Sequence, residues 1–98
     1  MLEVTWGLQV DDAALYADYR AAMKPILSSF EGAFVLDLWV AERLLAPTDA
    51  PFNRLFTIRF ASERSMEAFF AHPDYLAAKR TFFTRSVSSV SELSRRSL

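Results

Sequence analysis

Two hydrophobic patterns, one typical of strands and one typical of helices, alternate along this chain. Their order constrains the fold more than any other feature. Residues 2–10 alternate apolar and polar side chains, which is typical of a strand with one buried face. From Asp12 to Phe30, apolar side chains recur three and four positions apart, which is typical of a helix that buries one face. The pattern therefore predicts a strand followed by a helix.

Two strand patterns then follow with no helix between them. Residues 34–44 and 54–60 both alternate, and a loop with prolines near both ends, 46–51, separates them. A second helical pattern starts after Ser62, which suits the cap position, and a serine-rich strand at 86–93 closes the order. The order βαββαβ predicts a ferredoxin-like α+β fold, in which a four-stranded antiparallel sheet carries both helices on one face.

Several residues predict where the helices begin, bend and end. Asp12 suits the cap of the first helix. Pro25 lies inside the first helical pattern and removes one backbone hydrogen bond, so we expect a kink rather than a break. Gly32 follows the last apolar position and suits a left-handed helix end. His72 and Pro73 interrupt the second helical pattern, which predicts a new segment that begins at the proline.

The composition limits the functions open to the chain. Its 98 residues predict one domain, 1–98, whose polar residues 94–98 we expect to fray. A net charge of −1 argues against nucleic acid or an anionic membrane as a partner. The absence of cysteine excludes disulfides, and the absence of any run of about 18 apolar residues argues against a membrane span. We therefore expect a cytoplasmic protein.

The strand pattern at 34–44 is apolar on both of its faces. Read as a regular strand, it points Phe34, Leu36 and Leu38 toward the helices. Val35 and Trp39 then point the other way, where two helices on one side of the sheet cannot cover them. We therefore expect a homodimer in which a second copy of the chain covers this face.

Several of these motifs together resemble a known family. They lie between about Val10 and Lys79, and they are Tyr16-x-x-Tyr19 after the Asp cap, Pro25, Gly32, Phe60-x-Ser62, and His72-Pro73-Asp74-Tyr75 with Lys79. The pattern resembles small domain-of-unknown-function proteins of the dimeric α+β barrel superfamily. This resemblance implies a ferredoxin-like fold and a dimer in which two sheets face each other as a barrel.

The resemblance implies no particular reaction. The superfamily contains cofactor-free monooxygenases, dehydratases and isomerases of small aromatic substrates, and haem enzymes, while the most similar family has no agreed activity. The chain has one histidine, no cysteine and two glycines, so it predicts neither a metal site nor a glycine-rich phosphate loop. We expect no cofactor.

A set of polar and aromatic side chains is expected on the face opposite the helices, between the two sheets of the dimer. These candidate ligand-binding residues are Glu3, Gln9, Asp37, Trp39, Thr57 and Arg59. Hairpin pairing sets Arg59 opposite or diagonal to Asp37 and Trp39, so the three are predicted to line one polar cavity. Such a cavity suits an aromatic or anionic metabolite. The alternative is a structural ion pair at the centre of the dimer.

Two residues are candidates for catalysis. Asp37 is a candidate base, with Arg59 to hold an oxyanion, and His72 is a candidate proton carrier. The alternative role of His72 is a helix cap. Three tyrosines are interpreted as packing residues whose hydroxyls reach water: Tyr16, Tyr19 and Tyr75.

The sequence thus predicts a small homodimer that binds a small aromatic or anionic metabolite. The alternative is a cofactor-free enzyme, similar to a monooxygenase, isomerase or dehydratase, that acts on a small aromatic or carbonyl substrate. A third hypothesis is plain association of two copies without a ligand.

Overall fold

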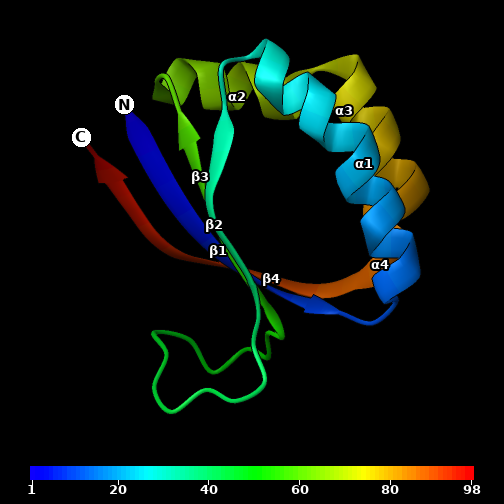
Figure 1. Ribbon diagram of the computed structural model, residues 1–98, viewed down its shortest axis with the longest axis vertical. Coiled ribbons are helices and arrows are strands. Elements are labelled where there is room, and N and C mark those ends of the chain that lie inside the picture. Colours follow the sequence, from blue (N-terminus) through cyan, green and yellow to red (C-terminus); the bar gives the residue numbers. More distant parts are fainter.

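The computed structural model describes residues 1–98 and has the predicted ferredoxin-like order (Figure 1). The strands are β1 (Leu2–Val10), β2 (Ala33–Trp39), β3 (Arg54–Phe60) and β4 (Val87–Ser97). The helices are α1 (Ala13–Ser29), α2 (Glu63–Ala71), α3 (Pro73–Ala78), the π-helical turn η1 (Lys79–Phe83) and the short α4 (Thr84–Ser86). All neighbouring strands run antiparallel, in the order β2-β3-β1-β4.

The molecule has two layers. Figure 1 shows the helices on one side of the twisted sheet, while the loop between β2 and β3 projects beyond the end of the sheet. We call the covered side, which carries Val4 and Ile58, the helix face, and the other side, which carries Thr5 and Thr57, the open face. None of the helices combines the length and apolar character that crossing a membrane requires.

Three side chains cap the helices as predicted. Asp12 Oδ1 and Ser62 Oγ each accept the backbone N–H three residues further on, both at 3.0 Å. His72 Nδ1 accepts the N–H two residues further on at 3.1 Å, which caps α3 where it begins at Pro73. The α1 helix continues through Pro25 without a break. The local signals in the sequence therefore determine these helix boundaries.

The end of α1 differs from the prediction at one residue. The left-handed backbone conformation belongs to Glu31, at φ 60°, and not to Gly32. Gly32 is needed for a different reason: a Cβ atom there would lie 2.4 Å from Leu27 Cδ1. The glycine permits a close approach of the chain to the end of the helix, rather than a left-handed turn.

The core lies between the helices and the helix face. Val4, Leu8, Ile58, Phe60 and Phe69 are at most 1% exposed. The strand residues among them alternate as the period of two predicts. One apolar cluster therefore joins the sheet to the helices.

The β2 strand contains a bulge that the sequence pattern does not reveal. Phe34 pairs with Ile58, but the next pair along the strands joins Leu36, and not Val35, to Thr57. One extra residue in β2 reverses the direction of every side chain after it. The regular alternation that the sequence predicts for this strand therefore fails in its second half.

The bulge moves four side chains to the faces opposite those predicted. Leu36 and Leu38 lie on the open face, 41% and 45% exposed, instead of facing the helices. Asp37 and Trp39 lie on the helix face, because their β3 partners, Phe56 and Arg54, are on that face. Both predicted placements are wrong for this one physical reason.

The C-terminal residues are paired, in contrast to the prediction that 94–98 fray. β4 extends to Ser97 and pairs with β1 as far as Leu2. The N–H of Leu98 donates to the carbonyl of Met1 at 2.8 Å, so the two ends of the chain lie side by side. The length of β1 provides the pairing partners that the tail alone does not predict.

The β2–β3 loop is longer than predicted, because β2 ends at Trp39 rather than Leu44. Its course is held by Arg43, which donates to three carbonyls within the loop and lies 4.9 Å from the centre of the Phe52 ring. Phe52 packs over Gly7, and a Cβ atom on Gly7 would lie 2.8 Å from Phe52 Cγ. The base of the loop thus covers part of the sheet next to β1.

Candidate functional site

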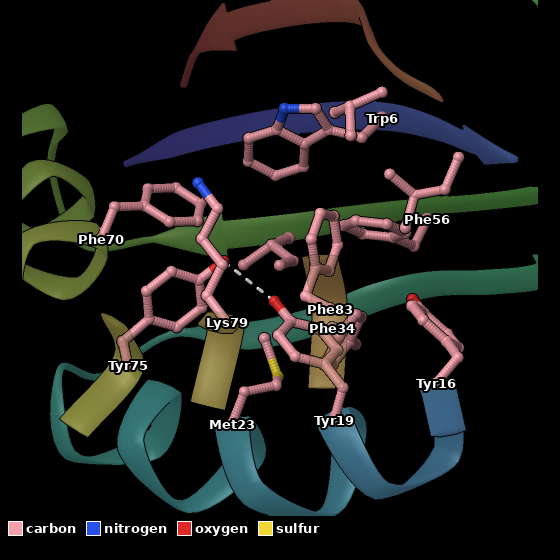
Figure 2. A pocket seen from close by; sticks show the side chains of 13 residues that line it. Trp6, Tyr16, Tyr19, Met23, Phe34, Phe56, Phe70, Tyr75, Lys79 and Phe83 are labelled. Carbon is pink, nitrogen blue, oxygen red and sulfur yellow. Dashed lines mark hydrogen bonds between the residues drawn. The ribbon is translucent and has the colours of Figure 1, made fainter. Parts of the chain in front are cut away.

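An aromatic pocket lies between the helices and the helix face of the sheet (Figure 2). Its volume is about 260 Å³, and twelve of its thirteen lining residues are hydrophobic. The sheet contributes Trp6, Phe34 and Phe56, while Tyr19 and Met23 rise from α1 toward the sheet. The alternation of the strands and the helical period of α1 therefore direct these rings into one space.

Two buried tyrosines hydrogen-bond to each other in this pocket. Tyr19 Oη lies 3.0 Å from Tyr75 Oη, which joins α1 to α3 (Figure 2). Burial raises the pKa of both phenols, and it raises the pKa of Tyr16, at the pocket wall, to about 12. The three hydroxyls are therefore neutral at pH 7, and the Tyr19 and Tyr75 hydroxyls bond to one another rather than to water as predicted.

Lys79 is the one lining residue that carries a charge. It begins the π-helical turn η1, and Phe83, at the end of that turn, also lines the pocket. Figure 2 shows the Lys79 side chain extending from its helix toward Phe70 and Trp6. A π-helical turn shifts the side chains that follow it, and such turns are frequent at functional sites. Lys79, at the start of this turn, supplies a cation to an otherwise apolar pocket.

A second cluster, Asp37 with Arg20 and Arg54, lies at the edge of the helix face. Asp37 Oδ1 accepts from Arg54 Nε at 2.9 Å and lies 2.8 Å from Nη2, while Oδ2 accepts from Arg20 Nη2. The Arg54 guanidinium lies 4.4 Å from the centre of the Trp39 ring and 5.4 Å from that of Tyr16. The bulge in β2 produces this cluster, because it turns Asp37 and Trp39 toward α1.

A third cluster, Glu3 with Arg59 and Arg96, lies on the open face. Glu3 accepts from Arg59 Nε at 2.9 Å and from Arg96 at 3.2 Å. The hydrogen bonds from Arg59 and then from Arg96 lower the pKa of Glu3 below its usual value. Glu3 is therefore ionised at neutral pH, and the pairing stabilises the fold above the unfolded-state pKa and is lost as pH falls through the folded-state value.

The single polar cavity predicted for Arg59, Asp37 and Trp39 is not formed. Arg59 lies on the open face, where its partner is Glu3, whereas the other two lie on the helix face. Thr57 is buried on the open face, and its hydroxyl lies 2.7 Å from that of Thr5. Gln9 shares that face, but no ion pair or side-chain hydrogen bond joins it to Arg59. The candidates therefore fall into two groups on opposite sides of the sheet.

The predicted catalytic set is not assembled either. Both oxygens of Asp37 accept from arginines, and Arg59, the predicted oxyanion partner, is not one of them. His72 caps α3 and lies against Phe30, away from Asp37 and Arg59. No group of three or more carboxylates, histidines or cysteines is arranged to hold a metal ion.

The sequence pattern does not identify the residues that build the two helix-face sites. Arg20 and Arg54 belong to none of the predicted clusters, and Lys79 belongs only to the family motif. One signal was available: Tyr16, Arg20 and Lys24 lie on one side of α1 at spacings of four, directly beside the apolar stripe. The bulge and the π-helical turn have no comparable signal, because both depend on tertiary contacts.

Comparison with solved structures supports the fold. A protein of unknown function from Rhodopseudomonas palustris superposes with a TM-score of 0.81 at 16% identity, over 97% of this chain and 79% of its own. A dabb family protein with a ferredoxin-like fold from Mesorhizobium loti gives a TM-score of 0.64 at 18% identity, over 99% and 95% of the two chains. At these identities the likeness concerns the fold alone.

A third structure is described as dimeric. This Bacteroides fragilis protein of unknown function has a ferredoxin-like fold and a TM-score of 0.63 at 10% identity, over 99% of this chain and 95% of its own. No curated protein has a matching sequence.

The sequence itself matches one family model. The model is that of a domain of unknown function, DUF1330, and it covers residues 5–90. This range runs from β1 into β4 and includes the whole aromatic pocket and the Asp37 cluster. The protein therefore belongs to the DUF1330 family.

Proposed function

We propose that this protein is a homodimer that binds a small aromatic compound in the pocket between its helices and its sheet. The observation that carries the proposal is the presence of a hydrogen-bonded pair of hydroxyls and one cation in a largely apolar space. They are the hydroxyls of Tyr19 and Tyr75 and the ammonium group of Lys79. Small-molecule sites are typically apolar with a few polar groups that fix orientation.

The size of the pocket limits the ligand. Its volume of about 260 Å³ exceeds the roughly 150 Å³ of an engineered apolar cavity that binds benzene. One aromatic ring with substituents fits this space. Rings from Trp6, Phe56 and Phe83 surround it and favour offset or edge-to-face contact with an aromatic ligand.

The polar groups indicate which substituent the ring carries. Because the pKa of Tyr19 and of Tyr75 is raised, both phenols keep their protons at pH 7. One hydroxyl donates to the other, which leaves one O–H free for a ligand, and Lys79 supplies a cation. Both groups favour an oxygen acceptor, so we propose a ring that bears a carbonyl or hydroxyl group.

The homodimer follows from the open face. Leu36 and Leu38 are each more than two-fifths exposed there, and Leu36 pairs with the buried Thr57 of β3. The helices of one chain all lie on the other side, so a second copy is the partner that the sheet geometry favours (Figure 1). The dimeric state of the Bacteroides relative supports this assignment.

The pocket is tested by titrating the protein with acetophenone and following its two tryptophan indole N–H signals by NMR. Trp6 lines the pocket and Trp39 does not, so the Trp6 signal should shift and the Trp39 signal should not. The double variant Tyr19→Phe/Tyr75→Phe should bind acetophenone about tenfold more weakly, because the carbonyl loses its hydroxyl donor.

Ethylbenzene serves as the matched control, because it has the same ring without the oxygen. The double variant should bind it as tightly as the wild type does. The proposal fails if acetophenone leaves the Trp6 signal unchanged, or if both compounds respond equally to the loss of the hydroxyls.

A further inference from the structure

A cleft separate from the aromatic pocket lies between α1 and the end of β2. Its volume is about 350 Å³. One wall is a side of α1 on which Ala13, Ala17 and Ala21 recur every four residues, and the other is formed by Trp39 and Arg54. Residues four apart share one face of a helix, and alanine side chains are short. The space between the two walls therefore stays open.

Three cations line this cleft. Arg20 and Lys24 extend from α1 and Arg54 from β3. Asp37 is the carboxylate paired with the two arginines, and Lys24 forms no ion pair. Three positive charges and one negative charge leave the cleft with two uncompensated positive charges, which favour an anion.

The arginines keep donors that the protein does not use. Arg54 donates to Asp37 through Nε, with Nη2 2.8 Å from the same oxygen, and Arg20 donates through Nη2 alone. In both guanidinium groups Nη1 has no acceptor within the protein. The Arg54 side chain is only 10% exposed, so its free donor is held in position by burial rather than by flexible water contacts. Such preorganised donors suit the two oxygens of a carboxylate.

Trp39 adds a flat apolar surface beside these donors. Its ring stacks on the Arg54 guanidinium at 4.4 Å and still remains 54% exposed. An exposed tryptophan next to an unsatisfied cation offers contact to an aromatic ring whose charged end reaches the arginines. Simple inorganic anions would use the charges but not this surface.

We infer that the cleft between α1 and Trp39 binds a small aromatic carboxylate, with the carboxylate at Arg20, Arg54 and Lys24 and the ring against Trp39. The inference does not rest on the aromatic pocket, although Tyr16 contributes to the walls of both spaces. The two sites differ in chemistry, because the pocket has a hydroxyl pair and one cation, whereas the cleft has three cations.

Benzoate, benzamide and acetate separate the charge from the ring. Titrated at low salt into the protein, benzoate should shift the Trp39 indole N–H signal. Benzamide has the ring without the charge, and acetate has the charge without the ring, so each should bind about tenfold more weakly than benzoate. Because Trp6 reports the pocket, a shift of Trp39 alone distinguishes this site from that of the proposed function.

Lys24→Glu tests the cations without breaking the Asp37 cluster, because Lys24 is exposed and unpaired. This variant should bind benzoate at least about tenfold more weakly, since it reverses one charge in the cleft. Arg64→Glu makes the same reversal at an exposed position of α2 and should change the affinity less than about twofold.

Three results would overturn the inference. The first is an affinity for benzamide equal to that for benzoate. The second is an equal loss of benzoate affinity in Lys24→Glu and Arg64→Glu. The third is benzoate that leaves the Trp39 signal unchanged. A shift of Trp6 alone would place benzoate in the pocket, and a shift of neither signal would leave the cleft without a ligand, while the pocket keeps its separate test with acetophenone.

Discussion

Each side of the sheet holds one carboxylate bound by two arginines, and the two clusters are built in opposite ways. On the open face Glu3 is the buried member, with a side chain 7% exposed, beneath Arg59 at 44% and Arg96 at 71%. On the helix face an arginine is the buried member: Arg54 is 10% exposed between two aromatic rings, while Asp37 is 18% exposed.

The difference shows which cluster keeps hydrogen-bond donors that are free to bind a ligand. A buried carboxylate covered by arginines has its acceptors filled, and the outer arginines turn their free donors to solvent or to a partner sheet. A buried arginine with a single carboxylate partner keeps a free donor beside an open cleft. The open-face cluster is therefore suited to an interface, and the helix-face cluster to a small anion.

The largest expected difference between the clusters concerns stability. Arg54→Met should lower the free energy of unfolding by about 3 kcal/mol. It takes one buried partner from Asp37 and removes the guanidinium that lies over the Trp39 and Tyr16 rings. Arg59→Met should cost less, because the Arg59 side chain is 44% exposed and solvent screens its ion pair. Urea unfolding of the two variants measures both losses, and equal losses would contradict the contrast.

A smaller effect is expected on dimer formation. It distinguishes the open face of the sheet from the side that carries the helices. Leu38→Glu on the open face should raise the dimer dissociation constant about a hundredfold, because a symmetric interface buries the new carboxylate twice. Leu76→Glu on α3, where the leucine is 37% exposed, should leave the dimer intact. Sedimentation velocity over a range of concentrations measures both. A wild-type protein that is monomeric at micromolar concentration would refute the open-face dimer.

The smallest effect is expected for deletion of Val35, the residue that forms the bulge. Removing it makes the pairing of β2 regular without moving Asp37 or Trp39 to the other face, so Tm should change by less than about 4 °C. Deletion of Leu38 instead turns Trp39 away from Arg54 and should lower Tm more. Thermal melts of the two deletions decide, and a larger loss for the Val35 deletion would show that the bulge itself is required.

The helix boundaries could be predicted because they depend on neighbours in the sequence. Asp12, Ser62 and His72 cap their helices through backbone groups two or three residues away. β1 and β3 could be predicted because their alternation is unbroken. The frayed tail was wrong because the pairing of β4 with β1 joins opposite ends of the chain, which no local pattern records.

The residue types of the predicted cluster do come together, but around a different arginine. An arginine bound to a carboxylate and stacked on a tryptophan does occur, as Arg54 with Asp37 and Trp39, but it was predicted for Arg59 on the other face. Successive side chains of a strand point to opposite faces of the sheet, so one extra residue reverses the face of every side chain after it. One unrecognised bulge was therefore enough to exchange the partners.

The sequence by itself determined the order of the elements, the helix caps and the ferredoxin-like fold, because hydrophobic periodicity and capping act over a few residues. Only the tertiary structure decided which face carries Asp37, which hydroxyl Tyr19 meets, and where Lys79 points. Each of these depends on a bulge, a helix–helix contact or a π-helical turn. Such features form when distant segments pack together, and their free energies come from contacts that the local sequence does not contain.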